Sequence, residues 1–170
     1  MISDELVRRL FDLASTDTGS PVECHESPNR EPRVQVTRVR VYSWCYQVEV
    51  AIEVSAAGVD DSSFSFHDPA RLRDDGLVDI VVSDGSKYEI RSEHEANDTH
   101  GAVVADELIG PFNDPSTGRV VLRYRGQYWC WPLPPDGNDI TISVGWPAGA
   151  VDSPVGIVAA GSFLAALGRS

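Results

Sequence analysis

The sequence predicts a mainly β protein: an antiparallel β-sandwich with an N-terminal and a C-terminal α-helix. Three observations predict this class. Apolar and polar residues alternate through the central part of the chain, turn residues divide that part into about seven to nine short segments, and apolar residues at both ends follow helical spacing. An immunoglobulin-like strand order is one form of this class. An α+β roll, with helices on one face of a single sheet, is the alternative.

The length of 170 residues suits a single domain. We expect four parts in it: an N-terminal helix over 1–15, a linker or loop over 16–32, a β domain over 33–147 and a C-terminal helix over 153–168. Apolar residues make up 42% and charged residues 24%, which is typical of a globular chain and argues against overall disorder.

The N-terminal helix is predicted by a cap and by an apolar stripe. Ser3 suits the N-cap, and Asp4 and Glu5 suit the positive end of the helix dipole. The helix should end near Ala14. Its stripe contains Leu6, Leu10, Leu13 and Ala14, widened by Val7 and Phe11.

The C-terminal helix is predicted to begin at Ser153-Pro154, with serine at the N-cap and proline at the first helical position. Gly168 suits the position just after its end. Its apolar stripe contains Ile157, Ala160, Leu164 and Leu167.

Two strands are predicted early in the β domain. Val34 and Val36 alternate, and Val39 and Val41 resume the alternation one residue out of phase, which indicates a β-bulge near Thr37-Arg38. The clearest strand follows. Its apolar face contains Trp44, Tyr46, Val48, Val50, Ile52 and Val54.

Two hairpins are predicted from turn residues and side-chain faces. The first surrounds Asp84-Gly85-Ser86, with an odd-length loop that pairs Val82 with Tyr88 and Ile80 with Ile90. The second joins 120–125 to 128–133 through a type II′ turn at Gly126-Gln127. With the strand over 140–146, the second hairpin should form an antiparallel meander.

The charge of the chain limits its partners. The formal net charge is −12, so we expect neither nucleic acid nor an anionic membrane as a partner. The chain opens on Met1-Ile2-Ser3-Asp4-Glu5 without a basic segment, and the apolar stretch 155–167 is too short to span a bilayer. We therefore expect a cytoplasmic protein.

The three cysteines, Cys24, Cys45 and Cys130, are odd in number and lack CxxC spacing. They predict neither a disulfide framework nor a cysteine zinc site. Cys45 and Cys130 fall on predicted outer faces and could meet in space, but reduced thiols on half-buried strands are the expectation.

Near the C-terminus, the segment Trp129-Cys130-Trp131-Pro132-Leu133-Pro134-Pro135 is followed by Gly145-Trp146-Pro147. This arrangement resembles an uncharacterised actinobacterial protein family with a C-terminal W-P-L-P-P…W-P block. The resemblance covers about the last third of the chain, and it implies neither an activity nor catalytic residues.

The segment 93–100 gathers two imidazoles and three carboxylates. Both groups bind zinc, manganese and iron, so His94, Asp98 and His100 are a candidate site for a divalent metal cofactor. The spacing matches no known metal helix, and a solvated polar loop is the alternative.

A basic spot is predicted on the outward face of the second hairpin, from Arg119, Arg123, Arg125 and Tyr128. Arginine could grip an anion or a partner there, although salt bridges to Glu49 or Glu53 are the alternative. The four tryptophans, Trp44, Trp129, Trp131 and Trp146, fall on predicted inward faces and should belong to the core.

The function expected from the sequence is a non-enzymatic β-sandwich that acts through protein contacts or self-association. The chain lacks the G-x-S-x-G, P-loop and G-x-G-x-x-G motifs. A metal-dependent hydrolase or metal-binding protein and a small-ligand-binding β domain are the alternatives. His67 is a weaker candidate for a general base, because no nucleophile stands near it at a recognisable spacing. Cys24 and His25 are also weaker candidates, because adjacency in sequence does not give the side-chain geometry of a nucleophile–base pair.

Overall fold

A computed structural model describes residues 1–26, 33–56, 79–91, 96–145 and 154–168. His67, His94 and Trp146 therefore lie outside the described residues. Within these ranges the helices are α1 (Asp4–Thr16) and α3 (Ser162–Leu167). The strands are β1 (Ser20–Val22), β2 (His25–Glu26), β3 (Arg33–Val41), β4 (Tyr46–Ala56), β5 (Asp79–Ser83), β6 (Glu89–Arg91), β7 (Gly101–Asp114), β8 (Arg119–Trp131), β9 (Ile140–Gly145) and β10 (Gly156–Val158).

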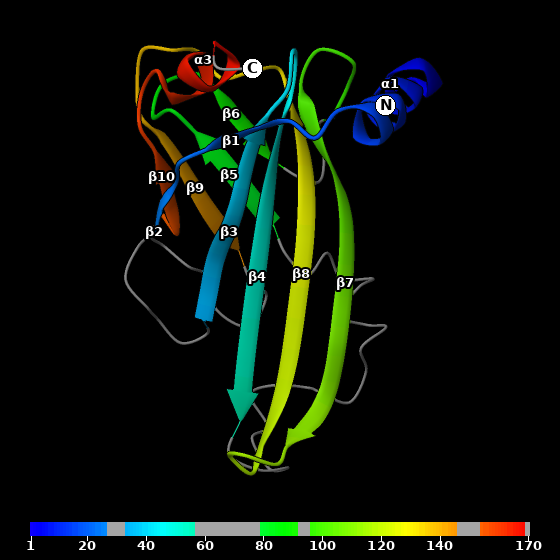
Figure 1. Ribbon diagram of the computed structural model, residues 1–170, viewed down its shortest axis with the longest axis vertical. Helices are drawn as coiled ribbons and strands as arrows, with labels where there is room; N and C mark the ends of the chain where they lie inside the picture. The colour runs from blue at the N-terminus through cyan, green and yellow to red at the C-terminus, as the bar shows by residue number, and fades with distance from the viewer. Residues whose placement is uncertain (27–32, 57–78, 92–95, 146–153, 169–170) are drawn as a thin grey trace.

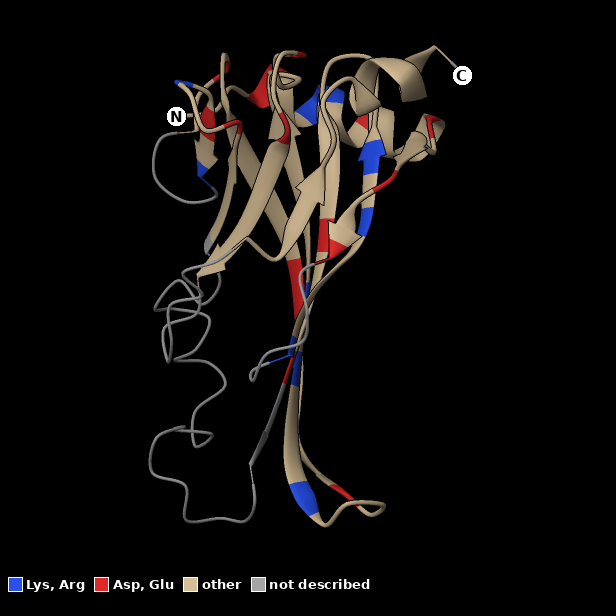
Figure 2. Ribbon diagram, turned by 90° about the vertical axis from the view of Figure 1, so that its left-hand side faces the viewer, with Lys and Arg blue, Asp and Glu red and all other residues tan. Residues whose placement is uncertain are grey.

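The strands form two five-stranded antiparallel sheets, as a sandwich predicts (Figure 1). Sheet A has the order β1-β3-β4-β8-β7, and sheet B has the order β2-β10-β9-β5-β6. The prediction of a mainly β, sandwich-like protein with a helix near each end is confirmed, and the two sheets distinguish the fold from a single-sheet roll. The long strands β4, β7 and β8 continue past the end of sheet B as a narrow ribbon with charges of both signs (Figure 2).

The main core lies between the sheets. From sheet A it takes the inward row of β4, where Tyr46, Val48, Val50 and Ile52 are almost fully buried, as the alternation predicts. Sheet B supplies the facing row of Ile80, Val82, Ile140, Ile142 and Val144. Each such side chain contributes about 1.5–3 kcal/mol of burial energy.

The β-bulge predicted near Thr37-Arg38 is confirmed. Val36 pairs with Val50 and Arg38 pairs with Glu49, so β3 has one residue more than β4 at this point. The extra residue returns Val39 and Val41 to the buried face.

The hairpin predicted at Gly126-Gln127 is wrong. Residues 119–131 form one continuous strand, β8, which pairs with β4 on one side and β7 on the other. The meander is wrong for the same reason, because β8 belongs to sheet A and β9 to sheet B. Gly126 lies inside the strand, where the rings of Tyr124 and Tyr128 leave no room for a Cβ atom.

The hairpin at Asp84-Gly85-Ser86 exists, but its predicted register is wrong by two residues. Val82 pairs with Ile90 instead of Tyr88. The loop still has odd length, so both apolar side chains face the core and are buried. A tight turn is formed within the loop, where the Ser86 backbone N–H and hydroxyl donate to Asp84 at 2.9 and 2.5 Å.

Two segments contain strands where the sequence predicts none. The linker predicted over 16–32 contains β1 and β2, which are edge strands of the two different sheets. In the helix predicted over 153–168, residues 156–158 form β10, which pairs with β2 and β9. The helix itself is limited to α3, and the backbone of Gly168 has right-handed helical dihedrals at its end.

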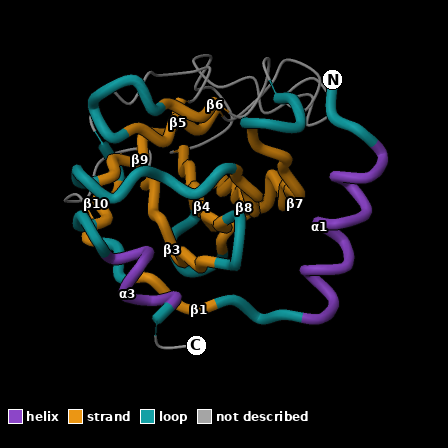
Figure 3. The backbone as a smooth tube through the Cα atoms, turned by 90° about the horizontal axis from the view of Figure 1, so that it is seen from above, coloured by secondary structure: helices purple, strands orange, loops and turns teal. Residues whose placement is uncertain are grey.

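Helix α1 packs on the outer face of sheet A, beside β7 and β8 (Figure 3). Ser3 caps it as predicted, because its hydroxyl accepts a hydrogen bond from the Leu6 N–H at 3.2 Å. A second, smaller core forms beneath the helix from Leu6, Leu10, Tyr42, Cys45 and Trp131. No helix in the described parts of the chain is long and apolar enough to cross a membrane.

Candidate functional site

The residues predicted as an anion or partner contact are only partly brought together. Arg119, Arg123 and Arg125 are exposed and alternate along β8. Tyr128 does not share their face, because β8 makes no turn. It is fully buried in the core, where its hydroxyl lies 2.8 Å from that of Tyr124.

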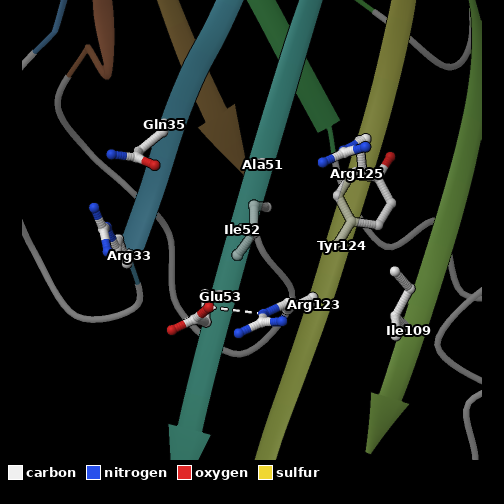
Figure 4. Close-up of a pocket in the computed structure, with 9 residues that line it drawn as sticks. All are labelled: Arg33, Gln35, Ala51, Ile52, Glu53, Ile109, Arg123, Tyr124 and Arg125. Atoms are coloured by element: carbon white, nitrogen blue, oxygen red, sulfur yellow. Dashed lines mark hydrogen bonds and ion pairs between the residues drawn. The ribbon is translucent and has the colours of Figure 1, made fainter.

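The outer face of sheet A is hollowed beside Arg123 and Arg125 (Figure 4). The hollow has a volume of about 200 Å³. Strands β3, β4, β8 and β7 line it with Arg33, Gln35, Ala51, Ile52, Glu53, Ile109, Arg123, Tyr124 and Arg125. Arg33 was not among the residues predicted for this site, because alternation within a strand says nothing about which strand lies next to it.

One ion pair crosses the hollow. The Arg123 Nε donates to a carboxylate oxygen of Glu53 at 2.9 Å, and the two residues are paired across β4 and β8. The salt bridge to Glu53 foreseen from the sequence is therefore present. Both side chains are about half exposed, so this pair contributes little to stability.

The candidate metal residues lie near the start of β7, except for His94, which is outside the described residues. Asp98 accepts a hydrogen bond from the Ser3 backbone N–H at 2.8 Å. The Nδ1 of His100 lies 3.3 Å from the Asn97 side-chain amide and 3.2 Å from the Thr99 hydroxyl. The described residues contain no cluster of three His, Cys, Asp or Glu side chains suited to a metal, and the site stays a prediction.

Asp98 ties the start of α1 to the loop before β7. The hydrogen bonds from Ser3 lower the pKa of the Asp98 carboxyl below its ordinary value. Its stabilising effect should thus be present above the unfolded pKa of about 4 and should be lost as pH falls through the lower folded pKa.

We expect Asp98→Ala to loosen the first turn of α1, because the Ser3 N–H loses its acceptor. Amide hydrogen exchange in α1 should become faster, and NMR titration of the wild type should show a lowered Asp98 pKa. Asp114→Ala is the matched control, since Asp114 accepts hydrogen bonds from Ser116 in a distant turn. Unchanged exchange in Asp98→Ala, or an ordinary Asp98 pKa, would contradict this role.

The three thiols are poorly suited to nucleophilic chemistry. Desolvation by burial raises the pKa of Cys24 to about 11 and the pKa values of Cys45 and Cys130 to about 12, so all three stay protonated at neutral pH. Cys130 is buried in the main core, which corrects its predicted placement on an outer face. Cys45 is buried in the smaller core beneath α1, and both thiols are free.

An exposed apolar surface lies on α1. Val7 and Phe11, which were expected to widen the buried stripe, are 38% and 72% exposed. They are spaced one helical turn apart, so their side chains are neighbours. Strand β7 is the nearby edge of sheet A, but Asp106 and Glu107 place charges along it, which discourages pairing with another strand.

Among known proteins, no family model, no curated protein and no solved structure matches this chain. The likeness of the C-terminal block to an actinobacterial family therefore stays an expectation from the sequence.

Proposed function

We propose that the protein is a non-enzymatic, cytoplasmic β-sandwich that acts by binding another protein through helix α1. The observation that supports this proposal is the exposed pair Val7 and Phe11. A large aromatic side chain at 72% exposure leaves apolar area in water that a partner could cover.

The buried side and the exposed side of α1 together support binding of a partner. Leu6 and Leu10 fix the helix to sheet A, so Val7 and Phe11 are presented on a helix that is already folded. A partner that binds them has little ordering entropy to overcome.

The test compares Phe11→Ser with Leu164→Ser. Leu164 is 58% exposed on α3 and makes a matched control for an exposed apolar side chain. We expect native mass spectrometry and affinity isolation to show a dimer or a bound protein for the wild type and for Leu164→Ser, and its loss for Phe11→Ser. Stability should change by less than about 0.5 kcal/mol in both variants.

A monomer without a bound protein in all three samples would contradict the proposal. Equal loss of the partner in both variants would show that the contact does not depend specifically on α1. An immunoglobulin-like strand order stays a prediction on which the proposal does not depend. The metal alternative also stays a prediction, because it requires His94.

A further inference from the structure

The hollow on the outer face of sheet A is a second surface whose chemistry points to a ligand (Figure 4). We propose that it binds an acidic, carboxylate-bearing segment of a partner protein. The hollow shares no residue with the exposed pair on α1, so this inference does not depend on the function proposed for α1.

The shape of the hollow follows from the register of sheet A. In one row, Ala51 of β4 lies between Gln35 of β3 and Arg125 of β8. The adjacent row brings Arg33, Glu53, Arg123 and Ile109 together across four strands. Because alanine is the shortest side chain among these residues, the longer ones around it form walls and Ala51 forms part of the floor.

The walls contain more positive than negative charge. Three guanidinium groups, from Arg33, Arg123 and Arg125, surround one carboxylate, that of Glu53, which pairs with Arg123. Among the described residues, no ion pair involves Arg33 or Arg125, although Glu107 stands opposite Arg125 in the register. Within the described parts of the chain, these two arginines have no carboxylate partner, so an incoming anion can pair with them.

Carboxylate is an anion that matches this arrangement. A guanidinium group binds a carboxylate through two parallel N–H···O bonds, and the amide of Gln35 is a further donor in the wall. Phosphate can form the same paired bonds with arginine, so it is the competing anion in the test below.

The surroundings favour an extended acidic segment over a small free acid. Arg38 is exposed on the same outward face of β3 beyond the bulge, while Val39 and Val41 face the core. Arg40 lies further along this face, but its Nη1 donates to the Thr18 carbonyl. Arg33, Arg125 and Arg38 together offer several contacts to a chain with several carboxylates, whereas a small acid would meet the open hollow alone. The net charge of −12 repels an acidic segment from most of the molecule, so such a segment is attracted only where arginines outnumber acids, as they do at this hollow.

The experiment is a titration of the full chain with a short, capped poly-glutamate peptide, followed by calorimetry and by the arginine Nε–H signals in NMR. Succinate and inorganic phosphate are titrated in parallel at an ionic strength of about 0.15 M. We expect the peptide to bind more tightly than either small anion, and Arg33→Gln and Arg125→Gln each to weaken it by about tenfold.

Arg91→Gln is the matched control. It removes the same charge from the edge of sheet B, where Arg91 pairs with Glu89 at 2.5 Å, and it should leave peptide affinity unchanged. Thermal melts check that all variants remain folded, which is expected because the substituted side chains are exposed. Glu53→Gln should tighten binding.

Each contrary result overturns the proposal. Absence of peptide binding removes the site, and equal weakening by Arg91→Gln would show unspecific attraction to positive charge. If succinate binds as tightly as the peptide, the ligand of the hollow is a small acid and not an acidic segment. If phosphate binds more tightly than the peptide, carboxylate is not the preferred group.

Discussion

Trp131→Ala is expected to lower the free energy of unfolding by about 3–5 kcal/mol and to release helix α1 from sheet A. Trp131 is 2% exposed and lies at the centre of the smaller core, with Leu6 and Leu10 of the helix above it. Its indole Nε1–H donates to the Asn97 carbonyl at 2.8 Å, so truncation also removes the donor for that group.

Two measurements distinguish release of the helix from general destabilisation. Urea unfolding gives the free energy, and amide hydrogen exchange should show a larger loss of protection in α1 than in β4, whose core lies on the other face of sheet A. Trp44→Ala is the control, because Trp44 is half-buried at the border of the same cluster with the Arg9 guanidinium 4.5 Å above its ring. An equal loss in both variants, or unchanged protection of α1, would be evidence against this role for Trp131.

The position of Trp131 explains why the hairpin prediction failed. The sequence 128–131 is apolar at every position, since both faces of β8 are buried there: Tyr128 and Cys130 face sheet B, while Trp131 lies under α1. Alternation identifies a strand only when one face is polar. Gly126 then suggested a turn, and a hairpin with that turn would place Trp129 and Trp131 on the inner face.

The successful predictions depended on local signals. The bulge in β3 could be predicted because the shift of the apolar alternation occurs within one strand. The cap of α1 could be predicted because Ser3 accepts a hydrogen bond from Leu6, only three residues away. By contrast, β10 takes its strand form from β2 and β9, and the arginine hollow depends on which strands are neighbours. These pairings join distant parts of the chain, and side-chain periodicity does not encode them.

Gly126→Ala is expected to destabilise the protein by about 1–3 kcal/mol, although replacing a glycine inside a strand by alanine ordinarily stabilises the strand. A Cβ atom at this position would lie 2.7 Å from the Tyr124 hydroxyl and 2.7 Å from Cε2 of Tyr128. Both rings are buried and joined through their hydroxyls, so neither can move aside without breaking core contacts.

Chemical denaturation of paired variants separates this crowding from the general effect of replacing glycine. Gly137→Ala is the control, because its Cβ would meet no atom within 4 Å and its stability should change little or rise slightly. Tyr124→Phe removes the hydroxyl that the new Cβ atom would meet. It should therefore lower the free energy of unfolding less in the Gly126→Ala background than in the wild type. If Gly126→Ala is neutral or the two substitutions simply add, the tyrosine pair does not require glycine, and the continuous strand needs another explanation for this residue.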